Sequence, residues 1–367
     1  LKGSVTKRAK RAKEVLKSPQ DFIKVIRVNY EAAWRDPMAT MLKQEKLDLV
    51  VFDEIHRIKS PSGRSSRYCA QLAKTCKRKI GLTGTIMPHG PMDIYAQFRA
   101  LNPMVFGTSF AQFKINYAVM SGYQNYQVVS FKNEKELRSK IRQITYEVGA
   151  EVLDLPKAIH MFKECQLGAA AQKIYDNMES DFYSEVEEGN ITAQNALVKL
   201  LRLRQMVGGY APTDEGEYVK IDNSKSALLK ETLEDLGSEP VVVFCQFRQD
   251  IKTVHDVCAE LEIESRELSG RVKEHDEWSA GSGQVLAVQI QAGGVGIDLT
   301  RTRYCIYYSL SFNLGDYLQS LARVHRPGQN HNVRYIHLLA SETIDIRVHK
   351  ALQKRQNIIE EILHGDM

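Results

Sequence analysis

Hydrophobic and polar residues alternate along this chain in blocks that predict strands and helices in turn. In the N-terminal third, strands are expected at 24–29, 47–53 and 78–82, with a helix at 65–76. From Pro240 onward, strands are expected at 241–244, 285–289, 304–309 and 334–339, and helices at 250–261, 318–324 and 344–362. Strands that alternate with helices form parallel sheets, so both parts of the chain predict α/β units.

The middle third has a different pattern. Residues 169–188 and 192–206 have helical periodicity, and runs rich in β-branched residues are scarce between 103 and 223. We therefore expect a helical insertion and connector between the two α/β units.

Composition narrows the class of protein. The 367 residues are 43% hydrophobic and 26% charged, which is typical of a folded protein of two or three domains. No apolar run approaches the roughly 20 residues that a membrane span needs, and the basic N-terminus lacks the apolar core of a secretory signal. Six cysteines without a C-x-x-C pair predict reduced core thiols in a cytosol-like compartment, with structural zinc as the weaker alternative.

The net charge of +5 is unevenly distributed. Residues 55–92 contain no acid and eight basic side chains, and the first 35 residues are also rich in lysine and arginine. Such stretches can track a phosphate backbone, but most charge runs are solvated helix faces. Both interpretations stay open on charge alone.

Two adjacent acids end the second predicted strand. Residues 47–56 read LDLVVFDEIH, so Asp53 and Glu54 stand at the carboxyl end of an apolar run, with His56 two residues later. Open α/β sheets bind ligands at this edge, where one carboxylate can hold Mg²⁺ while its neighbour polarises a water. Helix capping is the alternative, since such acids are common caps.

Three further patterns carry chemistry. Arg323 and Arg326 are three residues apart and share a helix face, and their guanidinium groups suit the charge on a transferring phosphoryl group. A surface ladder of ion pairs is the alternative. The glycine-rich turn QAGGVGIDLT at 291–300 can bring backbone N–H groups to an anion, and the turn LTGT at 82–85 follows a strand.

The order of these patterns resembles one family closely. DEIH, LTGT, VVVFCQF at 241–247, QAGGVGIDLT and QSLARVHRPGQ at 319–329 are similar to motifs II to VI of superfamily 2 helicase-like ATPases. Within them, the ending R-x-H-R-x-G-Q and the A-G-G-x-G turn are most similar to the SWI/SNF-type translocases of double-stranded DNA. The resemblance covers nearly the whole chain.

The resemblance implies a fold and a set of roles. It implies two RecA-like lobes with ATP and Mg²⁺ between them, the first lobe at 1–105, the helical connector at 106–222 and the second lobe at 223–367. Asp53 would hold Mg²⁺ and Glu54 would activate water, with Arg326 as the arginine finger and Arg323 beside it. The expected nucleotide-lining residues of the second lobe are Gln319, Gly294, Gly296 and Asp298. Those expected to couple hydrolysis to DNA are His56, Thr83, Thr85, Arg57 and Lys59.

One part of the pattern is missing. A phosphate loop needs G-x-x-x-x-G-K-[ST], and no Gly-Lys-Ser or Gly-Lys-Thr occurs in the chain, which begins with Leu. We expect this loop to precede residue 1 in a longer protein. The chain alone is then an inactive fragment, and the rival hypothesis is a non-catalytic nucleic-acid-binding or scaffold protein. Smaller departures from the family's usual residues are Ala322, Asp298 and Gln291.

The expected activity is ATP-dependent movement on duplex DNA, with ATP and Mg²⁺ as cofactors and DNA as partner. Strand separation on DNA or RNA uses the same motifs and remains an alternative. The chain offers no aromatic-rich element that would read bases, so sequence-specific recognition is not expected. The short inserts favour a bacterial or phage source and a cytoplasmic location, or a nuclear one in a eukaryote.

Overall fold

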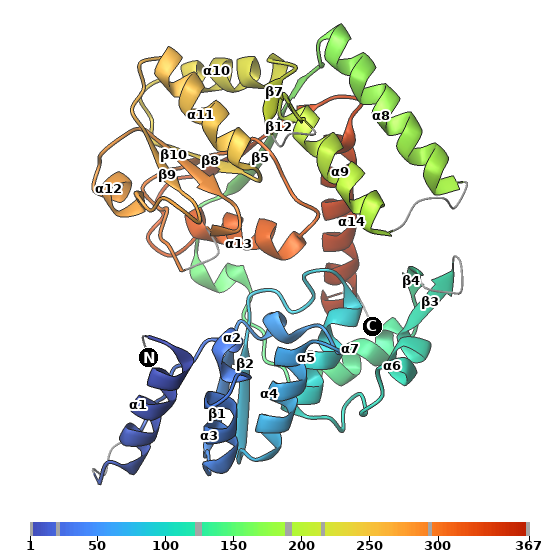
Figure 1. Ribbon diagram of the computed structural model, residues 1–367, viewed down its shortest axis with the longest axis vertical. Coiled ribbons are helices and arrows are strands. Elements are labelled where there is room, and N and C mark those ends of the chain that lie inside the picture. The colour runs from blue at the N-terminus through green and yellow to red at the C-terminus, as the bar shows by residue number, and fades with distance from the viewer. Residues whose placement is uncertain are drawn as a thin grey trace. The chain divides into compact units, whose positions relative to one another are not determined.

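The computed structural model describes residues 3–19, 23–121, 127–187, 193–213, 217–292 and 296–364. The chain forms two compact units, which are described separately (Figure 1). Unit 1 contains residues 1–147 and 357–367, and unit 2 contains residues 148–356. The three segments predicted above, 1–105, 106–222 and 223–367, stay a prediction.

Unit 1 combines helices with two small sheets. Its helices are α1 (Val5–Lys17), α2 (Tyr30–Ala33), α3 (Met38–Gln44), α4 (Arg64–Lys74), α5 (Ile94–Leu101), α6 (Phe110–Tyr117) and α7 (Glu134–Arg142). Short 3₁₀ turns lie at Ile55–Ile58 and Pro91–Asp93. Its strands are β1 (Leu49–Asp53) and β2 (Arg78–Leu82), which pair in parallel, and β3 (Ala118–Ser121) and β4 (Gln127–Phe131), which form an antiparallel pair.

The parallel pair β1–β2 has one covered and one open face. Phe52 is buried, whereas Leu49, Val51, Ile80 and Leu82 are 46–50% exposed. The register pairs Asp53 with Leu82, so the residues that follow both strands leave the sheet at one edge. Parallel sheets are normally covered on both faces, so the open apolar face of this pair is unusual.

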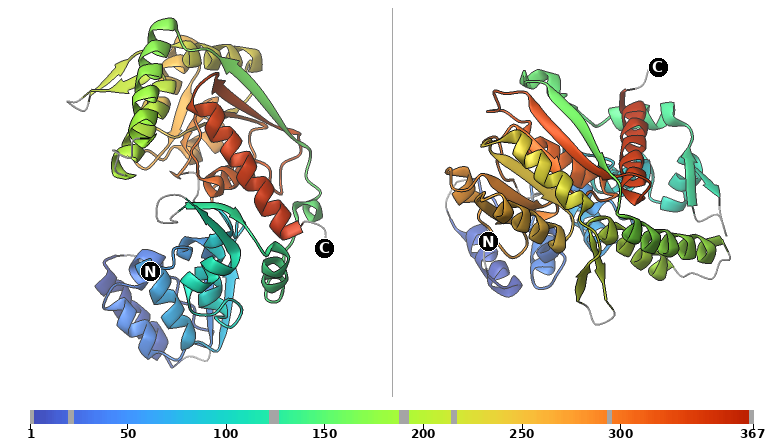
Figure 2. Two further views of the ribbon diagram at one scale, coloured as in Figure 1. Left: turned by 90° about the vertical axis from the view of Figure 1, so that its right-hand side faces the viewer. Right: turned by 90° about the horizontal axis from the view of Figure 1, so that it is seen from above.

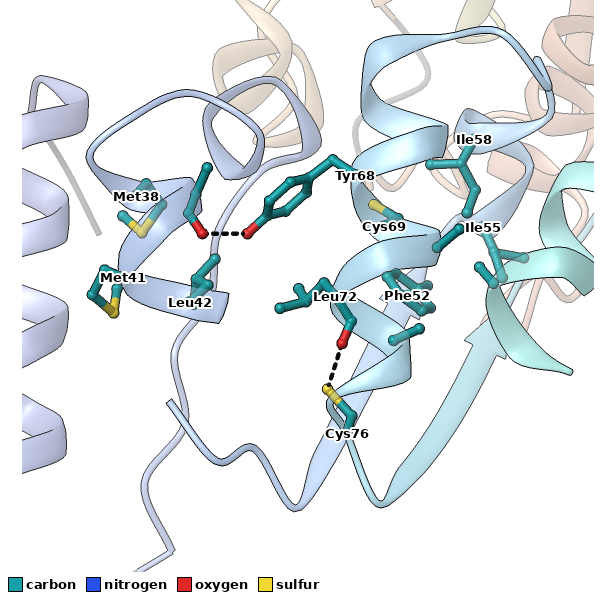
Figure 3. Packing of buried hydrophobic residues seen from close by; sticks show 14 of the residues in the cluster. Met38, Met41, Leu42, Phe52, Ile55, Ile58, Tyr68, Cys69, Leu72 and Cys76 are labelled. Atoms are coloured by element: carbon teal, nitrogen blue, oxygen red, sulfur yellow. Dashed lines mark hydrogen bonds between the residues drawn. The ribbon is translucent and has the colours of Figure 1, made fainter. Parts of the chain in front are cut away.

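The covered face packs against α3 and α4, as Figure 3 shows. Tyr68 of α4 points toward α3, where its hydroxyl donates to the carbonyl oxygen of Ala39 at 3.1 Å. At Gly81 of β2, a Cβ atom would lie 2.7 Å from Cδ1 of Ile55, so a larger residue would displace the Ile55 side chain. This packing holds the segment after the acid pair tightly against the sheet.

Unit 2 is built on a six-stranded sheet in the order β5-β12-β11-β8-β10-β9, in which every pair is parallel. These strands are β5 (Ala158–Cys165), β8 (Val241–Cys245), β9 (Ser265–Leu268), β10 (Val285–Gln289), β11 (Tyr304–Tyr307) and β12 (Val333–Ala340). A short pair, β6 (Tyr210–Pro212) and β7 (Tyr218–Lys220), is antiparallel. The helices are α8 (Ala169–Glu187), α9 (Ala193–Val207), α10 (Ser224–Leu236), α11 (Arg248–Glu260), α12 (His275–Ser279), α13 (Leu314–Val324) and α14 (Ile344–His364), and Ala150–Leu153 forms a 3₁₀ turn.

Helices cover both faces of the unit 2 sheet (Figures 1 and 2). Side chains of alternate strand positions, such as Val243 and Ile306, pack with α10 and α11. The opposite face carries a stack of rings from Phe244, Tyr307 and His337, which continues to Tyr317 of α13 and to α14. All five residues of β8 are fully buried, as expected for a central parallel strand.

Helix α14 belongs to both units. Its residues up to Gln356 are part of unit 2, and those from Asn357 onward are part of unit 1. Within unit 1, Ile362 is fully buried, and Nε of Arg138 donates to its carbonyl oxygen at 2.7 Å. Arg142 donates to the carbonyl oxygen of Leu363 at 3.0 Å. Two arginines therefore satisfy carbonyl groups at the carboxyl end of α14, where positive charge is favourable.

Every strand and helix predicted from the sequence forms except one, whereas many other elements, among them α1, α5 and β5, were not predicted. Residues 24–29 form no strand: their backbone is irregular, although Ile26 and Val28 pack against the core of unit 1. The cysteine prediction is confirmed in that all six are free and five are buried. Burial raises the pKa of the Cys245 and Cys305 thiols. Among the described residues, no helix is both long and apolar enough to cross a membrane, and no cluster of three or more metal-ligating side chains occurs.

A buried histidine makes the stability of unit 2 depend on pH. His337 is completely buried, its ring lies nearly parallel to that of Tyr307 at 4.9 Å, and burial lowers its pKa from 6.5 to about 3. Below pH 6.5, His337 therefore binds a proton in the unfolded chain but not in the folded chain. The unfolding free energy falls as the pH drops from 6.5 toward 3. From pH 7 to pH 5, we expect this one side chain to cost about 2 kcal/mol of the unfolding free energy.

The replacement His337→Phe keeps the aromatic stack and removes the titration. It should reduce the loss of stability between pH 7 and pH 5 by about 2 kcal/mol, measured by urea unfolding of the Trp34→Phe protein, in which Trp278 alone reports on unit 2. His160 and His349, whose pKa values burial also lowers, should leave a smaller residual loss. The exposed control His331→Gln should keep the full loss. An equal loss in the His337→Phe protein would contradict this origin.

Candidate functional site

The acid pair lies where β1 leaves the sheet. Asp53 is the last residue of the strand and is exposed to solvent. Glu54 follows with φ 51° and ψ 55°, a left-handed conformation that non-glycine residues seldom adopt. Its side chain makes no capping hydrogen bond to the 3₁₀ turn that it precedes. The helix-cap interpretation of Glu54 is therefore wrong, and the backbone turn serves another purpose.

The left-handed turn directs the Glu54 side chain toward the LTGT turn, the second motif of unit 1. Oε2 of Glu54 lies 3.2 Å from Nδ1 of His56, and the same nitrogen lies 2.9 Å from Oγ1 of Thr83. Oγ1 of Thr83 in turn donates to the carbonyl oxygen of Thr85 and accepts from its N–H, both at 3.1 Å. Because β1 and β2 are parallel and in register, DEIH and LTGT meet at one edge. The structure brings together four of the predicted residues.

Sequence reasoning missed the residue that supports this edge. The hydroxyl of Tyr30 donates to the carbonyl oxygen of Asp53 at 2.9 Å, fixing the backbone beside the carboxylate. Burial, assisted by Cys69 and Asp53, raises the pKa of Tyr30, so the hydroxyl remains a donor. Its position beside Asn29, which caps α2, could have indicated a structural role but not this contact.

The acid-free segment of unit 1 borders a basic cavity of about 270 Å³. Its lining includes Trp34, Arg57 and Arg64 and one acid, Glu31, together with Ser60, Ser65 and Ser66. The guanidinium carbons of Arg35 and Arg64 lie 5.2 and 5.5 Å from the centre of the Trp34 ring. Arg57 was predicted to contact DNA and lines this cavity. Lys59, predicted with it, is half-buried and does not line it.

In unit 2, the glycine-rich turn meets Arg326, which lies in the loop after α13 (Leu314–Val324), so the prediction that Arg323 and Arg326 share a helix face is wrong. Nε of Arg326 lies 3.8 Å from Oδ2 of Asp298, and its NH1 donates to the carbonyl oxygen of Ile297 at 3.2 Å. The N–H and hydroxyl of Thr300 both bond Oδ1 of Asp298, at 2.9 and 2.7 Å. Partial burial opposes the effect, but these bonds and the charge of Arg326 hold the pKa of Asp298 below its usual value.

The remaining residues predicted for unit 2 are Arg323, Gln319, Gly296 and Gly294. Arg323 is in the last turn of α13, and its carbonyl oxygen accepts from the N–H of Leu299 at 3.0 Å. Gln319 is half-buried on the same helix. Gly296 has φ 50°, a conformation that suits glycine, whereas Gly294 lies outside the described residues. Beyond α13, Nε2 of His325 contacts the carbonyl oxygen of Pro156 at 2.6 Å and fixes the loop that presents Arg326.

Each unit therefore offers its own chemical groups. Unit 1 offers two adjacent carboxylates, one free to reach solvent and one linked to a threonine turn through histidine. Unit 2 offers two arginines held by a glycine-rich turn. Carboxylates that can polarise water and arginines that can take up phosphoryl charge are the groups that phosphoryl transfer to water requires.

Comparison with known proteins identifies related sequences for both parts of the chain. Residues 7–209 match the SNF2-related domain, and residues 224–328 match the helicase conserved C-terminal domain. An uncharacterised ATP-dependent helicase of Mycoplasma genitalium is 25% identical over 89% of this chain and 32% of its own length. The Chromodomain-helicase-DNA-binding protein 1-like of Danio rerio is 26% identical over 98% of this chain and 36% of its own length.

A phage protein and a solved structure are also similar. Putative protein p41 of Acyrthosiphon pisum secondary endosymbiont phage 1 is 23% identical over 81% of this chain and 67% of its own length. The SWI2/SNF2 ATPase core of Sulfolobus solfataricus, solved with double-stranded DNA, is 22% identical with a TM-score of 0.45, covering 91% of this chain and 72% of that chain. The chain spans about a third of the length of the helicases it matches above.

Proposed function

The chain belongs to the family of SNF2-related domains, and on that premise we propose that it is part of an ATP-dependent translocase on duplex DNA. In this proposal, units 1 and 2 are two RecA-like lobes, the first incomplete, and residues of both act on one ATP. Hydrolysis in each cycle changes the grip on the duplex and moves the protein along it.

The observation that carries the proposal is the contact chain Glu54–His56–Thr83–Thr85. A carboxylate that only hydrolyses a phosphate ester needs no link to a second strand end. Here Oε2 of Glu54 lies 3.2 Å from Nδ1 of the 12% exposed imidazole of His56, and the same nitrogen contacts the turn that follows β2. A change in the position of the water or phosphate next to Glu54 would therefore shift Thr83 and Thr85. Coupling of ATP hydrolysis to movement requires such a link.

We assign the roles as follows. Glu54 orients and deprotonates the attacking water, since it is the carboxylate held by His56. Arg326 and Arg323 take up the negative charge that develops on the transferred phosphoryl group. Gln319, Gly294, Gly296 and Asp298 line the nucleotide from unit 2, and Asp298 holds Arg326 until the phosphates compete for it.

Asp53 is the residue that fits Mg²⁺. Its carboxylate is exposed at the strand end, and Mg²⁺ in nucleotide sites uses one or two carboxylates plus phosphate and water oxygens rather than a full protein cage. The ion would supply charge neutralisation for the β- and γ-phosphates.

The phosphate loop must come from outside residues 1–367, because the chain has no G-x-x-x-x-G-K-[ST]. The open apolar face of β1–β2 supports this part of the proposal. Four side chains half exposed on a parallel pair call for further strands or helices to cover them, and a phosphate loop joins a strand to a helix. The rival function, a non-catalytic scaffold, would need no such loop.

DNA contact in unit 1 is proposed at the basic cavity. Arg57 and Arg64 line it against a single lining acid, Glu31, and the adjoining stretch 55–92 contains no acid. Backbone contacts of this kind carry no base preference, as a translocase requires.

Displacement of a third strand from a DNA triplex tests the proposal. The protein that contains residues 1–367 and its phosphate loop should release a labelled third strand only with ATP, and should not separate a forked duplex. Release without ATP dependence would favour the scaffold. Separation of the duplex strands would favour a helicase.

A further inference from the structure

The exposed face of α1 carries a concentration of positive charge, and no ion pair joins it to another described residue. Five basic side chains, Lys7, Lys10, Arg11, Lys13 and Lys17, lie within an arc of about 160° at 100° per residue. The buried residues Ala9 and Ala12, which lie against the core of unit 1, are on the other side of the helix. Only one acid, Glu14, lies within the basic arc.

Positive charges placed so close together reduce the stability of α1. Lys7 and Arg11, and likewise Lys13 and Lys17, are like charges four residues apart, and the first turn has lysine but no acid. None of the five side chains forms an ion pair with another described residue. Residues that reduce the stability of a local element normally serve the function of the protein.

The helix is nevertheless held in a fixed orientation. Ser4 caps its amino end, and NH1 of Arg8 donates to Oδ1 of Asn29 at 3.2 Å. At its carboxyl end, Nζ of Lys24 donates to the carbonyl oxygens of Leu16 and Ser18 at 2.9 and 2.6 Å. The basic face is therefore presented outward on a fixed support rather than on a loose tail.

We propose that α1 is a second DNA-binding surface, which takes the phosphate backbone of a duplex at a place separate from the cavity lined by Arg57. This inference rests on the proposed function. From Lys7 to Lys17 the stripe is about 15 Å long, and a duplex carries one charge per roughly 1.7 Å of axis, so each cation can find a phosphate. A membrane is disfavoured because a membrane-bound helix inserts large apolar residues, and the only one exposed on α1 is Val15.

The salt dependence of duplex binding tests this surface. In the triple variant Lys10→Gln, Lys13→Gln, Lys17→Gln, glutamine keeps helix propensity and removes charge. The plot of log K against log[KCl] for a labelled 30-base-pair duplex should become shallower by about 2 to 3, since each lost phosphate contact removes about 0.9. Triple replacement by arginine should keep the original slope.

The matched control removes three exposed lysines from unit 2: Lys173→Gln, Lys220→Gln and Lys273→Gln. It should change the slope by less than 1. An unchanged slope in the α1 variant, or an equal change in the control, would overturn the α1 surface while leaving the proposed function standing. An unaltered protein that binds no duplex would instead contradict the proposed function. Circular dichroism confirms that the glutamine variant keeps its helices.

Discussion

Replacing Arg326 by alanine should reduce kcat for ATP hydrolysis by roughly 10³ to 10⁵, the range measured for loss of an arginine that stabilises phosphoryl transfer. The side chain is 35% exposed and loosely held, 3.8 Å from Asp298, so little of the fold depends on it. The guanidinium group acts mainly in the transition state, where negative charge spreads over the transferred phosphoryl group. Substrate binding should change much less than kcat.

Two further variants test whether the loss of kcat is specific to the Arg326 side chain. Arg326→Lys keeps the charge but loses the planar fork, so its kcat should lie between those of the alanine variant and the unaltered protein. Arg271→Ala removes an exposed arginine elsewhere in unit 2 and should leave kcat unchanged. The assay is steady-state ATP hydrolysis with duplex DNA by the protein that includes the phosphate loop. A decrease below tenfold for Arg326→Ala would contradict its assignment.

The largest expected effect on stability comes from a buried ion pair. Lys225 is 1% exposed, and its ammonium group donates to Oδ2 of Asp345 at the start of α14, over the ring of Tyr308. Asp345→Ala leaves a buried ammonium group without its carboxylate. Breaking such a pair from one side should lower the unfolding free energy of unit 2 by about 3 to 5 kcal/mol.

Removing both charges separates this cause from simple loss of packing. The double variant Lys225→Met, Asp345→Leu should recover most of the stability, because no charge is then left buried. Urea unfolding followed by Trp278 fluorescence in the Trp34→Phe protein measures both. The exposed pair Lys252–Asp256 of unit 2 gives a control, and Asp256→Ala there should leave the unfolding transition of unit 2 nearly unchanged. Equal losses in the single and double variants would contradict the ion-pair explanation.

Periodicity predicted the strands that are buried or end at a motif. β2 and β10 begin and end at the predicted residues, and β8 differs by one. For β8 and β10, apolar runs in buried parallel strands leave little ambiguity, whereas β2 is marked by the LTGT turn that follows it. The segment at 24–29 has the same apolar character but no partner strand, since Asn29 caps α2 instead. β5 was missed because it lies at the sheet edge with most side chains exposed, and it is defined by its pairing with β12.

The candidate site was predicted as a set of residues but not as a set of contacts. The sequence indicates that Glu54, His56 and Thr83 belong together only through order along the chain. Their distances follow from the parallel register of β1 with β2 and from the left-handed turn at Glu54. The contacts of Tyr30 and Thr300 were not predicted, because these residues act through hydrogen bonds to Asp53 and Asp298 that exist only in the folded chain.

Third-strand displacement, run with unaltered and Glu54→Gln proteins that carry the phosphate loop, is the most direct measurement of ATP-driven movement on duplex DNA. Glutamine keeps the shape of Glu54 but cannot take a proton from water, so the variant should still bind ATP and DNA. We expect release of the third strand by the unaltered protein with ATP, and none by the variant or with a non-hydrolysable analogue. Equal release by both proteins, or release by neither with the duplex bound, would contradict the proposed function.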